Sequence, residues 1–122
     1  MNNLKEWAST YYKFRKSFGK FKLIEGKTLI LEYKDKKEEV ICNKDLSKVK
    51  LKPNEITVTN NSLKNQEFLI KNWTKFLIED LRIIFVNLET NFKWMIHPYI
   101  HDRVCEKKHI EKSIFSISNE KF

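Results

Sequence analysis

Three histidines and a cysteine recur at intervals of four residues near the carboxyl end of the chain: His97, His101, Cys105 and His109. Imidazole and thiolate groups four residues apart on a helix lie on one face and can share a metal ion. A helix that begins after Pro98 would place the last three groups on one side. They would then span about 12 Å over two turns, which one ion hardly bridges. His101, Cys105 and His109 are therefore weak metal candidates, and we expect no cofactor.

The same stretch could instead supply a nucleophile. One helical turn would bring the Cys105 thiol within reach of His101 or His109, and Asp102 would orient the imidazole. Acyl transfer also requires hydrogen-bond donors for the oxyanion, and helical side chains of this kind usually lack them. The constellation is incomplete, so we do not expect a thiol enzyme.

A third pattern is the Glu32-x-Lys34 spacing at the end of an extended run, which is found in metal-dependent nucleases. Such a site needs a second carboxylate on a neighbouring strand to hold Mg²⁺. The preceding Glu25 is only a loose fit. A small metal-dependent enzyme is thus the least favoured function, and whether the chain is an enzyme stays open, with a non-enzymatic role preferred.

Basic residues carry the strongest functional signal. The 122 residues include 24 Lys and Arg against 16 Asp and Glu, a net charge of +8. Residues 1–22 hold six basic side chains against one glutamate, and residues 44–52 hold four against one aspartate. An excess confined to two segments indicates an electrostatic footprint for phosphate groups or an acidic surface. Only three of the 24 are arginine, which favours contact with a nucleic-acid backbone over sequence reading.

One aromatic residue is predicted to lie among the lysines of the first helix. Tyr12 falls on the helix face opposite the apolar stripe, so its ring could stack on a base of a single strand while lysines neutralise phosphates. The residues predicted to contact nucleic acid all belong to the two basic segments: Lys5, Tyr12, Lys13, Lys16, Lys20, Lys48, Lys50 and Lys52. The alternative is a protein-interaction module, either an assembly subunit or an inhibitor that docks on an acidic partner surface.

These residues must be positioned by a small α+β fold. Residues 3–18 place Leu4, Trp7, Ala8, Tyr11, Phe14 and Phe18 at helical spacing, with Gly19 at the expected end. Extended runs follow at residues 28–33, 38–42, 48–52 and 54–59, and they predict an antiparallel sheet or meander. In residues 48–52 the apolar and lysine side chains alternate strictly, which is typical of a half-buried strand.

The second half of the chain predicts a helix, a hairpin and a further helix. Residues 62–79 carry an apolar stripe behind capping oxygens, residues 81–86 and 92–96 resemble paired strands, and residues 99–117 follow Pro98 as a third helix. We expect the helices to cover one face of the sheet.

Composition sets the remaining bounds. The length predicts one domain over residues 1–122. Two glycines and two prolines argue against flexible linkers and glycine-rich phosphate loops. The amino-terminal residues lack the apolar stretch of a secretory signal, and no apolar run is long enough to span a bilayer, so we expect a cytoplasmic protein. Oligomeric state and natural partner are not predicted by the sequence.

Overall fold

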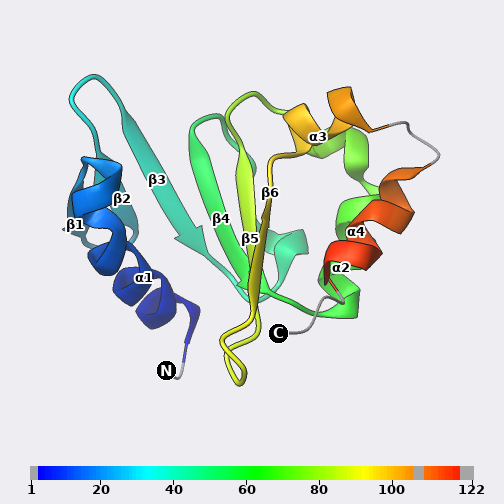
Figure 1. Ribbon diagram of the computed structural model, residues 1–122, viewed down its shortest axis with the longest axis horizontal. Helices are drawn as coiled ribbons and strands as arrows, with labels where there is room; N and C mark the ends of the chain where they lie inside the picture. The colour runs from blue at the N-terminus through cyan, green and yellow to red at the C-terminus, as the bar shows by residue number, and fades with distance from the viewer. Residues whose placement is uncertain (1–2, 106–108, 119–122) are drawn as a thin grey trace.

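The computed structural model describes residues 3–105 and 109–118. The fold is α+β, as predicted, and the described residues form four α-helices and a six-stranded mixed sheet (Figure 1). In chain order the elements are α1 (Leu4–Gly19), β1 (Lys22–Glu25), β2 (Leu29–Glu32), β3 (Lys37–Cys42), the 3₁₀ turn η1 (Leu46–Lys48), β4 (Glu55–Asn60), α2 (Leu63–Lys71), η2 (Trp73–Phe76), β5 (Arg82–Val86), β6 (Lys93–Ile96), α3 (Pro98–Val104) and α4 (Ile110–Ser118).

The strands follow one another across the sheet in chain order. The pairs β1–β2, β2–β3 and β5–β6 are antiparallel. Of the predicted meander, the pair formed by residues 28–33 and 38–42 is present as β2–β3, and the predicted hairpin is present as β5–β6, whereas β1 was not among the predicted runs. The pairs β3–β4 and β4–β5 are parallel, so the prediction of a wholly antiparallel sheet is wrong. The chain between each parallel pair crosses back along the sheet before the next strand begins, through η1 in one case and through α2 and η2 in the other.

Helix α1 packs on one face of the sheet. Asn3 caps its first turn by accepting from the backbone N–H of Glu6, at 2.8 Å. Its buried residues are Leu4, Trp7, Ala8 and Tyr12, which pack against inward side chains of β2 to β5 such as Leu31, Val40, Val58 and Ile84.

The predicted stripe of α1 is wrong in its carboxyl-terminal half. Phe14 and Phe18 are 79% and 78% exposed, and every residue from Lys13 to the end of the helix is exposed. This half of α1 finds no sheet surface on which to bury its rings. The helix does end at Gly19, where an added Cβ would lie 2.3 Å from the Phe21 ring, and Lys20 takes the left-handed conformation that caps it.

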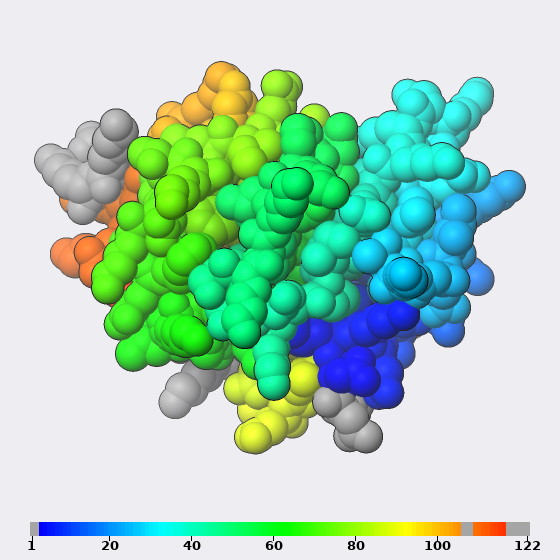
Figure 2. Space-filling view, turned by 180° about the vertical axis from the view of Figure 1, so that it is seen from behind, coloured from blue at the N-terminus to red at the C-terminus, as the bar shows by residue number. Residues whose placement is uncertain are grey.

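The other helices lie on the opposite face, so the expectation that all helices share one face is also wrong. Alternate residues of β5 divide between the two cores: Ile84 belongs to the α1 core, while Ile83 and Phe85 face the second core. The second core also includes residues of α2, η2, β6 and α4: Leu69, Trp73, Phe76, Trp94, Ile110 and Ile114. Figure 2 shows the molecule from behind, with η1 and the loop after it near the middle, α2 on one side of them and α1 on the other. The sheet therefore carries helices on both sides.

The predicted strand at residues 48–52 is not formed. Asp45 instead caps η1 through the backbone N–H of Ser47 at 3.1 Å, and residues 49–54 are irregular. Leu46 and Leu51 anchor this segment in the second core. The alternation of apolar and charged residues, which predicted a strand, belongs here to a loop whose apolar side chains point into the core.

Two predicted helices are interrupted. The helix expected at residues 62–79 ends at Lys71, because Asn72 leaves the helical conformation and its amide donates to the Phe68 carbonyl at 3.0 Å. The helix expected at residues 99–117 is divided between α3 and α4, with Cys105 in an extended conformation. Among the described residues, no helix has the length and apolar character needed to cross a membrane.

Candidate functional site

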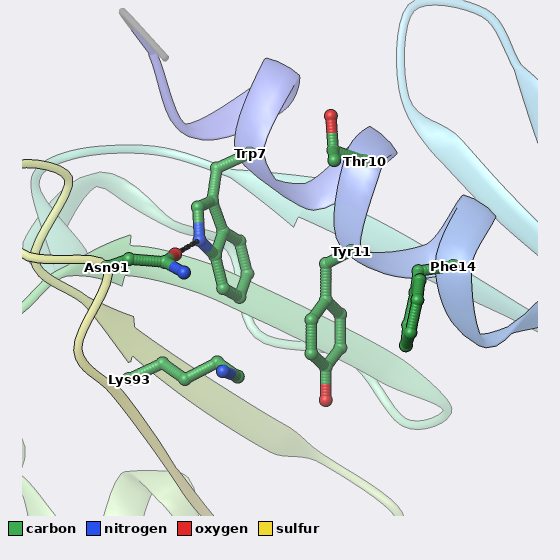
Figure 3. A pocket seen from close by; sticks show the side chains of 6 residues that line it. All are labelled: Trp7, Thr10, Tyr11, Phe14, Asn91 and Lys93. Atoms are coloured by element: carbon green, nitrogen blue, oxygen red, sulfur yellow. Dashed lines mark hydrogen bonds between the residues drawn. The ribbon is translucent and has the colours of Figure 1, made fainter.

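A groove lies between α1 and the edge strand β6 on the α1 side of the sheet. It is lined by Trp7, Thr10, Tyr11, Phe14, Asn91 and Lys93, which we call the α1–β6 groove, and its volume is about 210 Å³ (Figure 3). The three rings come from successive turns of one face of α1. Lys93 and Asn91 belong to β6 and to the turn before it, so the groove lies between the first helix and a hairpin that is far from it along the chain.

The Trp7 ring is fixed at one end of this groove. Its Nε1–H donates to Asn91 Oδ1 at 2.7 Å (Figure 3). Asn91 occupies a left-handed conformation in the β5–β6 turn, which asparagine tolerates better than most residues. This bond ties α1 to the hairpin and sets the width of the groove.

Tyr11 is the central ring. It stacks on Trp7 with the ring centroids 4.9 Å apart and the planes inclined by 12°. The Arg15 guanidinium carbon lies 5.4 Å and the Lys93 Nζ 5.6 Å from its centroid. Both distances are within the range of attraction between a cation and a π face. Phe14 stands beside it as a largely exposed ring. Tyr11 itself is partly buried and Trp7 is only 4% exposed, so Phe14 is the ring of this row that is open to solvent, next to the cations beside Tyr11.

Tyr12, the ring that the sequence predicted for this role, is only 7% exposed and belongs to the α1 core. Burial raises its pKa above the usual range. It meets the rings of Tyr11 and Phe21 edge to face. Tyr12 is unavailable for stacking on a ligand, and Tyr11 occupies the position that the prediction required. The spacing of Trp7 and Tyr11, four residues apart, already indicated that their rings lie on one face of α1. From the sequence, that face was assigned to the core.

The predicted basic residues of α1 do not form a purely basic face. Lys5 Nζ donates to the Gly26 carbonyl at 2.6 Å, and Lys13 Nζ lies 3.3 Å from Glu25 Oε1. Glu25 also accepts from Ser9, and these hydrogen bonds lower its pKa, the Ser9 bond most. Lys16 and Lys20 are exposed. Two of the four lysines are therefore partly engaged by strand β1 and its turn.

Lys48, Lys50 and Lys52 are exposed, as expected, but they belong to η1 and the loop after it. Since Leu46 and Leu51 of this segment pack in the second core, the loop and α1 lie on opposite faces of the sheet. The two predicted groups of lysines therefore come from opposite sides of the sheet, although the segments that carry them are both visible from behind (Figure 2). Their proposed contacts with nucleic acid remain predictions.

A second polar cluster lies on the α1 side of the sheet. Arg82 of β5 donates to the carboxylate of Glu38 of β3, and Lys36 Nζ lies 3.9 Å from the same oxygen. The side chain of Glu38 is 3% exposed. Tyr33 lies beside it, and burial, together with a hydrogen bond to Glu38, raises the Tyr33 pKa. Pairing by Arg82 and Lys36 explains how a carboxylate is accommodated in this position.

His97 lies at the end of β6. Its Nε2 atom is buried without a hydrogen bond, and burial, then the charge of Arg82, lowers its pKa. The sheet thus brings three titratable groups from separate strands to one of its ends: Arg82, Glu38 and His97. No sequence spacing indicated this cluster.

The continuous helix on which the weak metal and thiol candidates depended is not formed. α3 ends at Val104, so His101 and Cys105 do not share a continuous helix with His109. His101 instead contacts the Trp73 ring edge to face and lies 3.3 Å from the Ser113 hydroxyl. Asp102, the predicted orienting group, accepts from Trp73 Nε1 at 2.8 Å. In the described part of the chain, no three His, Cys, Asp or Glu side chains are grouped as metal ligands.

Glu25 and Glu32, the carboxylates of the least favoured nuclease interpretation, are also separated. Glu32 pairs in register with Lys22, while Glu25 pairs with Leu29 at the other end of the same ladder. Glu32 forms a 3.4 Å ion pair with Lys37. These carboxylates cannot hold one ion between them.

Comparison of the chain with protein-family models, curated proteins and solved structures finds no significant match. The α1–β6 groove is therefore interpreted from its own geometry.

Proposed function

We propose that this protein is a non-enzymatic module that binds single-stranded nucleic acid in the α1–β6 groove. The observation that carries the proposal is the Tyr11 ring, held by Trp7 and flanked by Arg15 and Lys93. A fixed aromatic ring beside cations is the minimal arrangement for stacking a base and neutralising the adjacent phosphate. The exposed ring of Phe14 offers a second stacking surface one turn further along α1.

Charge supports the same interpretation. The net charge of the chain is +8, and six of the basic residues lie in the first 22 positions. Lysine and arginine on the flanks attract a polyanion without reading bases, so we expect little sequence preference. A single strand is favoured over a duplex because a row of rings can stack only on unpaired bases.

The test is fluorescence anisotropy with labelled single-stranded and duplex oligonucleotides at several salt concentrations. Phe14→Ala removes an exposed ring without touching the core, and Tyr11→Leu keeps apolar bulk but removes the aromatic face. Each change should weaken single-strand binding by about 5- to 150-fold, the usual effect of losing one stacked base. Lys93→Gln should weaken binding and reduce the salt slope by about 0.7.

Lys75→Gln is the matched control, because Lys75 is an exposed lysine of η2 on the opposite face. It should leave the affinity and the salt slope close to those of the unmodified protein. Equal losses for Lys93→Gln and Lys75→Gln would assign binding to net charge alone. Unchanged binding in Phe14→Ala and Tyr11→Leu would refute the groove as the site.

The alternative, docking on an acidic protein surface, is favoured by one observation. Phe18 is 78% exposed near the end of α1 and lies outside the α1–β6 groove. A protein partner could cover this ring together with Lys16 and Lys20. Phe18→Ser separates the two functions, because it should abolish capture of a stoichiometric partner after nuclease treatment while leaving oligonucleotide affinity intact.

A further inference from the structure

Two carboxylates lie side by side on the face of the sheet opposite α1. Glu39 of β3 and Glu55 of β4 are Cα partners in the parallel ladder, so their side chains emerge from the same face of neighbouring strands. Glu55 is only 2% exposed. This pair is separate from the α1–β6 groove and from the Arg82 cluster, which both belong to the other face.

Neither carboxylate of this pair forms an ion pair with a basic side chain of the described residues. No salt bridge reaches either carboxylate within the described residues, in contrast to Glu38, which is paired by Arg82. Lys52 acts on Glu55 only through its charge, which lowers the Glu55 pKa, whereas burial and the neighbouring Glu39 raise it. Two adjacent carboxylates in a poorly hydrated position are costly unless a positive charge or a shared proton compensates them.

The hydroxyl of Thr57 is the second observation. Thr57 follows two residues after Glu55 on the same strand, so it lies on the same face, and it is completely buried. Both Thr57 Oγ1 and Glu55 Oε1 are buried, and within the described residues no group outside this cluster forms a hydrogen bond with either atom. A hydrogen bond from this hydroxyl to the Glu55 carboxylate lowers the Glu55 pKa, so the two groups lie side by side. A buried hydroxyl oxygen and a buried carboxylate oxygen are thus both left with unused lone pairs beside a second carboxylate.

Glu39 completes the arrangement. Thr28 Oγ1 donates to Glu39 Oε2 at 3.2 Å, which orients this carboxylate while leaving its other oxygen available. Glu39 is only partly buried, so water can reach its side of the pair.

We propose that Glu39, Glu55 and Thr57 form a binding site for one divalent cation of the hard class, such as Mg²⁺, Mn²⁺ or Ca²⁺. These ions take oxygen ligands, and Mg²⁺ is commonly held by one or two carboxylates with water in the remaining positions. The charge of +2 balances the two carboxylates. The inference goes beyond the proposed nucleic-acid function and does not depend on it.

The experiment is a titration of the chelator-treated full chain with Mn²⁺, followed by the electron paramagnetic resonance signal of the free ion. We expect one Mn²⁺ per chain with a Kd below about 1 mM. Glu55→Gln and Glu39→Gln should each weaken binding at least about tenfold, since each removes a ligand charge from the ion. Glu32→Gln is the control, because Glu32 is a carboxylate of β2 that already pairs with Lys37, and its affinity should be unchanged.

Thermal unfolding provides a second readout. A hundredfold excess of free Mn²⁺ over Kd should raise the Tm of the unmodified chain by about 5 °C or more. It should raise the Tm of Glu55→Gln by about half as much at most, because the Kd of this variant is at least about tenfold higher. If Glu55→Gln does not fold, Glu39→Gln decides, because Glu39 is partly exposed and its replacement disturbs packing less.

Three results would overturn the proposal. One is the absence of Mn²⁺ binding at about ten times the expected Kd. Another is equal affinity in all three glutamine variants, which would indicate dispersed surface binding. The third combines two observations: Glu55→Gln is as stable as the unmodified chain, and Mn²⁺ changes the Tm of neither protein. This result would show that Glu39 and Glu55 share a proton and do not bind a cation. None of these results bears on oligonucleotide binding in the α1–β6 groove, so the two proposals fail separately.

Discussion

Removing the guanidinium of Arg82 should destabilise the protein, because it leaves the buried carboxylate of Glu38 without its principal partner. The side chain of Glu38 is 3% exposed and that of Arg82 is 26% exposed. Arg82→Met keeps most of the apolar stem in place and removes only the charge and the donors. The remaining cation near the carboxylate, Lys36, is 3.9 Å away and its side chain is 56% exposed.

The magnitude follows from this geometry. Breaking a buried ion pair by removing one partner costs about 3–5 kcal/mol. We expect about 3 kcal/mol for Arg82→Met at pH 7, the lower end of this range, because Lys36 and the Tyr33 hydroxyl still stabilise the charge. Replacing both partners, Arg82→Met with Glu38→Leu, should recover to within about 1 kcal/mol of the original stability, since no unpaired charge is then buried.

Urea unfolding of the four proteins in this cycle measures the coupling energy, provided that the m-value is the same for all four. The control cycle uses Lys37→Met and Glu32→Leu. This pair has a 3.4 Å contact, and its side chains are 69% and 35% exposed. Coupling in the control should stay below about 1 kcal/mol. A cost of less than about 1 kcal/mol for Arg82→Met, or equal coupling in the two cycles, would refute the reasoning from burial.

Four further predictions concern pH, thiol reactivity and backbone conformation. Burial, then the charge of Arg82, lowers the pKa of His97, so the folded state binds fewer protons than the unfolded state. The free energy of unfolding should therefore fall as the pH drops below about 6.5. In urea unfolding, His97→Gln should reduce this dependence of the free energy of unfolding on pH. Hydrogen bonding by Ser47, then Lys64, lowers the pKa of Asp45 to about 2. The contribution of the Asp45 carboxylate to stability is therefore complete above about pH 4 and is lost towards pH 2. In an NMR titration, the Asp45 carboxyl resonance should move only near pH 2. Burial raises the pKa of the Cys42 thiol to about 11. In a Cys105→Ser background, a thiol reagent at about pH 8 should therefore modify Cys42 about a hundredfold more slowly than free cysteine. A rate close to that of free cysteine would contradict the burial of Cys42. Lys20→Gly should raise the free energy of unfolding by about 1 kcal/mol, because Lys20 has φ 53° and glycine adopts this conformation without a steric penalty; a loss of stability in thermal unfolding would argue against it.

The local elements were the most predictable part of the fold. The β5–β6 hairpin and the β2–β3 pair were predicted from alternating or continuous apolar runs bounded by polar turns, and both are present. α1 was predicted from helical spacing, and its terminus at Gly19 is where glycine was expected to stop it. These features depend on residues close in the sequence, so the pattern contains the information needed to identify them.

The candidate site was less predictable. The sequence indicated an aromatic residue among cations on α1 but selected Tyr12, which is buried, whereas the ring flanked by cations is the partly buried Tyr11. Successive helix residues are about 100° apart, so two neighbouring tyrosines at the edge of an apolar stripe cannot be assigned to the core or to solvent from periodicity alone. The position of β6, which supplies Lys93 to the same ring, decides the matter.

By itself, the sequence determined the α+β class, the approximate positions of most helices and strands, and the concentration of positive charge in two segments. Only the tertiary structure decided that β3, β4 and β5 run parallel, that helices cover both faces of the sheet, and that the two basic segments lie on opposite faces. It also brought Glu38 to Arg82 and Glu39 to Glu55, pairs that lie far apart along the chain. Helical and strand periods are set by backbone geometry over a few residues, whereas strand order and side-chain pairing depend on the packing of distant segments, and no local pattern records that packing.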